Sequence, residues 1–410
     1  MFAKTLLPAL AVVGAAAAAS SSTSSVNAIC TQATATVNSA ADATALAACS
    51  TISGSILIGP NVVGPINIDG PEEVTGDFIA ENAGGLTTIE SSSIKTIGGD
   101  FTLTNLTTLS TLSFAKLTKV ATIGWSALPA LPQLTMGGPI GEAASVLITN
   151  TFLNTLDGIN LDTVNTLNIN NNNRLKTFST QVGTIHDLLN IDSNGKDLDV
   201  SFPNLIWAAN MTFRNCSSIS IPSLATVNGS LGFYENYFKD LSAPNLTTVG
   251  NTANGQGSLA FVANPSLANI TIPGLTKVGG AFQIANNSAL EDISFAKLAT
   301  VGGAIDFSGN FSTPELPALN DVKGGFNMQS TAQIDCSGFK SEASSGNIQG
   351  TFTCKTTADA KSGTSSSGSG SSTTSGSGSS STSKAAAASY GVNEALVGVS
   401  FVGGLLQMLL

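Results

Sequence analysis

A short pattern returns along this chain at a nearly constant interval and constrains the fold more than any other feature. The segment VGGAFQIANN begins at Val278, and VGGAIDFSGN begins at Val301. With Phe282 as position zero, the pattern is apolar at zero and +2, Asn at +5 and Leu at +8. The full template fits the segments that begin at Leu167, Leu259 and Phe282, and ten looser matches bring the total to thirteen segments. The looser matches have zero positions at Ile56, Phe78, Phe101, Ile123, Val146, Leu189, Met211, Leu231, Ile305 and Phe326. Successive starts lie 20 to 23 residues apart, except for one interval of 28 whose GNTANGQG segment (250–257) we interpret as a loop insertion.

A period in the low twenties with alternating apolar residues is typical of a solenoid whose coils each add one short strand to a parallel sheet. We therefore predict an all-β fold, a right-handed parallel β-solenoid with a period of about 22 residues. Thirteen coils at about 4.8 Å each predict a rod on the order of 60 Å long. Glycine pairs before many strands, such as Gly279-Gly280 and Gly302-Gly303, predict tight corners between faces.

The residue at +5 explains the recurring asparagines. An inward turn leaves backbone groups without ladder partners, and an Asn amide satisfies both donors and acceptors as it stacks from coil to coil. The predicted ladder contains Asn172, Asn194, Cys216, Asn236, Asn264, Asn287 and Asn310. We interpret Cys216 as a buried ladder residue, and the alternative is a reactive or intermolecular thiol. Because Asn310 also lies at +5, we predict that its side chain faces inward and that its glycosylation sequon is inaccessible.

The open ends of a solenoid are unpaired sheet edges and need caps. Cys30 and Cys49 bracket an Ala-rich segment near the N-terminus, and Cys336 and Cys354 bracket the last stretch before a linker. In an exported chain we expect each pair to form a disulfide that closes one cap. Residues 33–48 suit a short capping helix.

Both ends of the chain carry export and anchoring signals. Residues 1–19 read as a signal peptide, with Lys4 before an apolar run and a small-residue exit at Ala17-Ala18-Ala19. The apolar C-terminal tail, 395–410, is shorter than the roughly 20 residues of a spanning helix. Small residues and a polar spacer precede it, so we predict a glycosylphosphatidylinositol (GPI) signal with attachment at Ser383 or Ala385, and a short transmembrane helix as the alternative.

The predicted organisation is a signal peptide (1–19), an N-terminal cap (20–55), solenoid repeats (56–335), a C-terminal cap (336–355), a Ser/Thr/Gly-rich stalk (356–384) and a removed anchor signal (385–410). The repeats form either one continuous solenoid or two abutting domains. We predict N-glycosylation of exposed sequons at Asn105, Asn210, Asn215, Asn228, Asn245, Asn269 and Asn286.

Few residues suggest catalysis or nucleic-acid binding. A net charge of −10 without any basic cluster argues against a nucleic-acid surface. Asp77 and Asp100 hold the same −1 position in adjacent coils and are the one candidate carboxylate pair, although a solvated surface row is the simpler interpretation. His186 is the single histidine and is interpreted as a solvated corner residue. We expect no catalytic residue, no metal and no cofactor.

The segment CSTISGSILI (49–58) resembles the opening of a receptor L-domain, and LTKVGGAFQIANNSALEDI resembles its repeat of strand, Asn turn and leucine. With both terminal signals, residues 30–410 resemble fungal GPI-anchored cell-wall organisation glycoproteins, the family that includes sporulation-specific wall proteins. The resemblance implies a glycoprotein of the outer plasma-membrane leaflet or wall, needed for wall integrity, with wall glucan or mannoprotein as possible partners. No dibasic stretch precedes the anchor site, which leaves membrane and wall retention both open.

Three functional hypotheses follow. The first is a non-enzymatic, anchored wall-organisation glycoprotein that displays a rigid rod. The second is a receptor-type or adhesin-type module that binds a wall glycan or protein through an outward face. The third is a glycan-active enzyme that uses Asp77 and Asp100.

Overall fold

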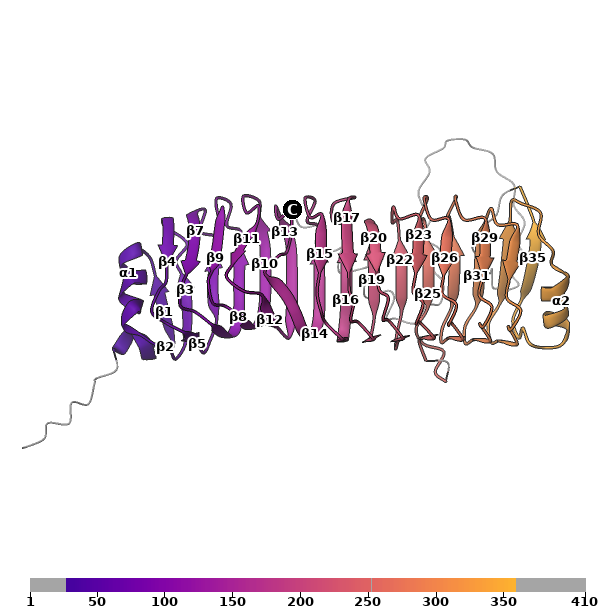
Figure 1. Cartoon of the computed structure of the whole chain (residues 1–410), viewed down its shortest axis with the longest axis horizontal. Coiled ribbons are helices and arrows are strands. Elements are labelled where there is room, and N and C mark those ends of the chain that lie inside the picture. Colours follow the sequence, from indigo (N-terminus) through magenta and orange to yellow (C-terminus); the bar gives the residue numbers. More distant parts are fainter. Residues whose placement is uncertain (1–26, 252, 359–410) are drawn as a thin grey trace, which may run out of the picture.

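Strands from successive coils stack in one column along the computed structural model, which describes residues 27–251 and 253–358 (Figure 1). The strand pairings in every sheet are parallel, and the main sheet runs unbroken from the first coil to the last. The prediction of an all-β parallel solenoid is therefore confirmed. Over the described residues the repeats form one continuous rod rather than two separate domains (Figure 1).

The register of the main column follows the sequence template. Phe282 pairs with Leu259 on one side and with Ile305 on the other, so position zero faces position zero. One recurrence of the pattern is therefore one coil. The column contains β1 (Thr34–Val37), β3 (Ser55–Ile58), β6 (Phe78–Glu81), β8 (Thr96–Thr104), β10 (Lys119–Leu128), β13 (Ser145–Thr151), β14 (Ile159–Asn170), β16 (Thr184–Asp192), β19 (Met211–Arg214), β22 (Leu231–Tyr234), β25 (Leu259–Val262), β28 (Phe282–Ala285), β31 (Ile305–Gly309), β34 (Phe326–Ser330) and β35 (Phe352–Thr356).

Each cap adds a strand that the template did not include. Strand β1 pairs with β3 at one end, and β35 pairs with β34 at the other, so the column is two strands longer than the predicted thirteen. The helix expected over residues 33–48 is correspondingly wrong in its first half. Ala35 and Val37 alternate inward as β1, and the α-helix is confined to α1 (Ala40–Ala45), followed by the 3-10 helix η2 (Leu46–Ala48).

Two further columns complete each coil. Short strands precede the main strand and belong to the same sheet: β2 (Thr51–Ile52), β5 (Glu73–Val74), β12 (Ile140–Glu142), β18 (Trp207–Ala208), β21 (Thr226–Val227), β24 (Thr248–Val249), β27 (Lys277–Val278), β30 (Thr300–Val301) and β33 (Asp321–Val322). The opposite face carries β4 (Val63–Asn67), β7 (Gly85–Ser91), β9 (Thr111–Phe114), β11 (Leu134–Met136), β15 (Thr177–Ser179), β17 (Leu198–Ser201), β20 (Cys216–Ser220), β23 (Asp240–Ser242), β26 (Asn269–Thr271), β29 (Asp292–Ser294) and β32 (Thr313–Glu315). This face is divided into four smaller sheets.

The interior is a continuous apolar core between these columns. Aromatic rings at zero and +2 pack from coil to coil: Phe233 and Phe261 stack with centroids 5.0 Å apart. Trp125 at +2 is fully buried and meets Phe101 edge to face. Burying one such side chain contributes roughly 1.5–3 kcal/mol, which is why a one-residue slip in register would be costly.

Disulfides and helices close both ends. Cys30, in the 3-10 helix η1 (Ala28–Thr31), is bonded to Cys49 after η2. Cys336, directly before α2 (Ser337–Ser344), is bonded to Cys354 in β35. Helices α1 and α2 lie at opposite ends of the rod (Figure 1). Each disulfide therefore closes the capping segment next to an edge strand.

The glycine pairs serve a different purpose from the predicted one. Gly279, Gly280, Gly302 and Gly303 all have negative or extended φ, so no special turn conformation requires them. A Cβ on Gly303 would instead lie 2.7 Å from the carbonyl carbon of Gly280 in the preceding coil. The corners need glycine because the backbones of adjacent coils approach too closely for any side chain.

The long interval contains a loop that leaves the coil and returns. Asn251 and Gln256 form an antiparallel bridge, and the backbone N–H of Asn251 donates to the Gln256 carbonyl at 2.7 Å. Gly250 and Gly257 flank this bridge with φ of 77° and 82°. The strands on both sides keep their register, so the loop is accommodated without disturbing the stack.

Candidate functional site

Inside the rod, asparagines at +5 form a column of hydrogen-bonded amides. The Oδ1 of Asn264 accepts the backbone N–H of Asn236 at 2.9 Å and its Nδ2 at 2.9 Å. Its own Nδ2 donates backward to the Phe233 carbonyl at 3.0 Å and forward to Asn287 Oδ1 at 3.0 Å. Asn264 thus bonds the coils on both sides, and the side chains of Asn172 and Asn236 do the same. The buried asparagines of this ladder are Asn172, Asn194, Asn236, Asn264 and Asn287.

Cys216 occupies the same inward position but supplies weaker bonds. Its side chain is fully buried, its Sγ lies 3.7 Å from the Arg214 carbonyl, and its N–H donates to Asn236 Oδ1 at 2.9 Å. Burial raises the pKa of the Cys216 thiol to about 12. A neutral, enclosed thiol is a poor nucleophile, and it interrupts the amide column between Asn194 and Asn236.

A second row of residues, at +4, makes the inward turn possible and was missed by the sequence reasoning. Ten consecutive coils place a non-glycine residue there with φ between 53° and 59°. Asparagine tolerates this left-handed conformation better than most residues, and its enrichment at +4 was the available signal. The ten residues are Asn82, Asn105, Ala127, Asn150, Asn171, Ser193, Asn215, Glu235, Ala263 and Asn286.

The prediction for Asn310 is wrong. In its coil the strand β31 continues through Gly309 without a left-handed turn at +4, so the next side chain points outward. Asn310 is exposed and accepts a hydrogen bond from Thr331 Oγ1 at 2.7 Å, while Phe311 takes the buried place. Its sequon is therefore accessible.

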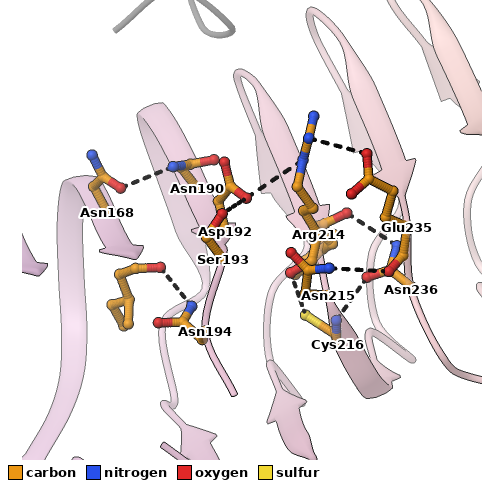
Figure 2. A network of polar contacts seen from close by, with 12 residues as sticks. Asn168, Asn190, Asp192, Ser193, Asn194, Arg214, Asn215, Cys216, Glu235 and Asn236 are labelled. Carbon is orange, nitrogen blue, oxygen red and sulfur yellow. Dashed lines mark hydrogen bonds and ion pairs between the residues drawn. The ribbon is translucent and has the colours of Figure 1, made fainter. Parts of the chain in front are cut away.

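On the outer face of the main sheet, polar side chains of neighbouring coils bond across the strands (Figure 2). Asn190 Nδ2 donates to Asn168 Oδ1 at 2.9 Å. Further along, the Arg214 guanidinium lies between two carboxylates, with Nε 3.4 Å from Asp192 Oδ1 and Nη1 3.3 Å from Glu235 Oε1 (Figure 2). These side chains are about one third exposed or more, so each ion pair contributes at most about 1 kcal/mol.

Asp77 and Asp100 are not arranged as a free carboxylate pair. Asp77 Oδ1 accepts the backbone N–H of Asp100 at 2.9 Å, and its Oδ2 accepts the Ser55 hydroxyl at 3.4 Å. The Asp77 carboxylate thus holds three coils in register. His186 is exposed, and its ring lies 5.8 Å from that of Trp207.

The sequons differ in exposure. Asn210 and Asn215 are half-buried, whereas the side chains of Asn105, Asn228, Asn245, Asn269 and Asn286 are exposed. No sequon occurs between residues 106 and 209. The attachment candidates Ser383 and Ala385, the signal peptide and nearly all of the stalk lie outside the described residues.

Neither a metal centre nor a membrane-spanning helix is found in the described part of the chain. Residues 27–251 and 253–358 hold no group of three or more His, Cys, Asp or Glu side chains placed to bind a metal ion. No helix in the same ranges has the length and apolar character required to cross a membrane.

Comparison with known proteins gives a consistent set of relatives. A family profile described as Ecm33, GPI-anchored cell wall organization protein, matches residues 1–47. The chain is 38% identical to the protein ecm33 of Aspergillus fumigatus, over 89% of this chain and 90% of the relative. It is 37% identical to a cell surface GPI-anchored protein of Arthroderma benhamiae (78% and 81% covered) and 33% identical to the cell wall mannoprotein PST1 of Saccharomyces cerevisiae (77% and 70%). No solved structure matches significantly.

Proposed function

The chain belongs to the family of fungal GPI-anchored cell-wall organisation proteins, and from this premise we propose that it works as a rigid, non-enzymatic glycoprotein rod that organises the wall. Its place is the cell surface or the wall, where the named relatives are found. The task of such a protein is to hold a defined surface at a fixed place outside the membrane, and stiffness is the property that this task needs.

The observation that carries the proposal is the uninterrupted main sheet together with the amide ladder inside it. Every coil is tied to the next by parallel strand pairs, and Asn236, Asn264 and Asn287 add bonds that span the coil boundary. At about 4.8 Å a step, the strand column is about 70 Å long. A rod held this way resists bending because any kink would break several buried hydrogen bonds at once.

The terminal segments complete the proposed mechanism. Residues 1–19 direct export, the Ser/Thr/Gly-rich segment 356–384 acts as the stalk, and lipid attached at Ser383 or Ala385 replaces the residues that follow the attachment site. Glycans on exposed sequons protect the rod and keep it soluble. At this location, the proposed binding partner is wall glucan or a mannoprotein.

A glycan-active enzyme is the weaker candidate, because Asp77 is used to bond the backbone of Asp100 and the hydroxyl of Ser55. A binding module is the stronger alternative, because the outer face over β14, β16 and β19 presents amide and carboxylate groups to solvent (Figure 2). The two functions are compatible if the rod organises the wall by holding a wall polymer.

The test is complementation in a fungal strain that lacks its own relative of this protein. The full chain should restore growth on dyes that disturb the wall. A chain ending at Ala358 should be released into the medium and fail to restore growth, and an Asp77→Asn/Asp100→Gln chain, which creates no new sequon, should restore it fully. Loss of rescue by a folded Asp77→Asn/Asp100→Gln chain would favour the enzyme, and rescue by the released chain would contradict the need for an anchor.

A further inference from the structure

Three cations face a groove of about 360 Å³ on one edge of the solenoid. Arg174 and Lys176 lie in the turn region after β14, and Lys196 lies in the turn after β16 of the next coil. None of the three forms an ion pair with a described residue. The groove's one carboxylate is Asp197, so three positive charges against one negative leave a local charge of +2. This local charge is opposite in sign to the net charge of the whole chain, which is −10.

Arg174 is held in place before any ligand arrives. Its Cζ lies 3.6 Å from the centroid of the half-buried Phe152 ring, which is a close cation–π contact. The ring covers one face of the planar guanidinium and leaves the N–H groups at its edge free to donate. Because the stacked side chain has already lost rotamer freedom, less entropy is lost when it binds an anion.

The two turns that carry the cations share one anchor. The backbone N–H of Leu175 and that of Gly195 both donate to the carbonyl oxygen of Asn172, at 3.0 and 3.2 Å. Asn172 is itself a buried rung of the amide ladder. A Cβ on Gly195 would lie 2.7 Å from the Asn173 carbonyl oxygen, so only glycine allows the turns to approach this closely. The spacing of Arg174 and Lys196 is therefore set by the core.

The groove is also open to large ligands. Its lining comes from residues 154–197, and the sequons nearest in sequence are Asn105 and Asn210. The coils that build it carry no N-glycan of their own. Asn154 and Asn173 add neutral amides to the lining, which suit the hydroxyls of a sugar.

We propose that this groove binds a phosphate group carried by a wall glycan. Arg and Lys together match the oxygens of a phosphate, and the flanking amides match a polyol attached to it. A nucleic acid is a poor candidate because it carries a phosphate at every nucleotide, whereas this groove offers only three cations on a chain whose net charge is −10. The inference rests on the proposed location at the wall, and phosphorylated mannan is the probe because it carries phosphate on a polymer of sugar hydroxyls, the two groups that the cations and amides of the groove match.

The experiment uses the full glycosylated chain, purified in detergent from a fungal host, with immobilised phosphorylated mannan and the same mannan after removal of its phosphate. The groove variant is Arg174→Gln/Lys196→Gln. Its control is Lys239→Gln/Lys297→Gln, which removes the same charge from exposed lysines elsewhere. Melting temperatures are compared first, and Lys176→Glu serves as the groove variant if the double substitution lowers stability.

We expect the wild type and the control to prefer phosphorylated mannan, and the groove variant to bind it at least about tenfold more weakly, as expected for losing charge-assisted bonds. Inorganic phosphate should compete. Equal binding of both mannans, equal losses in the groove and control variants, or no binding at all would overturn the inference. Rescue of the wall-defective strain by the groove variant would leave the proposed function intact, whereas failure of the wild-type chain to rescue would count against that function itself.

Discussion

Asn236 gives its backbone N–H and its side-chain Nδ2 to a single acceptor, the Oδ1 of Asn264, at 2.9 Å each. The two residues lie in neighbouring coils and are both fully buried. The amide oxygen of Asn264 thereby accepts two N–H groups of Asn236 for which the coil of Asn236 offers no acceptor. The stability of each coil consequently depends on the side chain of the next.

Replacing Asn264 by Ala should lower the free energy of unfolding by about 2–4 kcal/mol, because the N–H of Asn236 and the Phe233 carbonyl would be left buried without these partners. The matched control is Asn61→Ala, which removes an asparagine from the same +5 position where it is exposed. Neither substitution alters a sequon. Urea unfolding measures both, and similar losses in the two variants would contradict the structural role of the ladder.

Cys216 should resist alkylation at pH 8 in the folded protein and react fully in urea. Burial raises the pKa of its thiol from 9.0 to about 12, so the folded state keeps a proton that the unfolded state releases. The contribution of the Cys216 thiol to the free energy of unfolding is fully present below pH 9 and is lost as the pH rises from about 9 to 12. Unfolding curves of the wild type and Cys216→Ala across that range should show a shallower decline in the variant. A parallel decline, or rapid native alkylation, would refute the assignment.

Gly303→Ala should destabilise the rod by about 1–3 kcal/mol, because the added methyl group would overlap the backbone of Gly280. Gly138→Ala is the control, since its Cβ would have no atom within 4 Å, and its effect should stay within about 1 kcal/mol. Thermal unfolding of both variants decides the question. A harmless Gly303→Ala would mean that the coils can separate at this corner at little cost.

Removing either cap disulfide should lower stability by about 3 kcal/mol, as expected for loops closed over 19 and 18 residues. Two variants test this, Cys30→Ser/Cys49→Ser for the N-terminal cap and Cys336→Ser/Cys354→Ser for the C-terminal cap. Because each cap flanks an edge strand, β1 or β35, we also expect self-association through the freed edge. Light scattering after mild heating measures this, and a monomeric, fully stable variant would show that the helices alone protect the edge.

Much of the architecture follows from the sequence alone. The spacing from Phe282 to Ile305 determines the length of a coil, and alternation at zero and +2 determines which side chains face the core. These patterns are readable because the same local problem is solved in every coil, so each repeat is an independent indication of the same geometry. The family resemblance is equally local, because it rests on the repeat and the two terminal signals.

What only the tertiary structure decided depends on contacts between coils. The left-handed turn at +4 determines whether the next asparagine points inward, as Asn287 does, or outward, as Asn310 does. Gly303 is required by the backbone of a neighbouring coil rather than by its own conformation. Arg174 and Lys196 are 22 residues apart and meet at one groove because both turns bond to Asn172. A periodic sequence encodes what each coil repeats, whereas the distances between coils are set only when the coils stack.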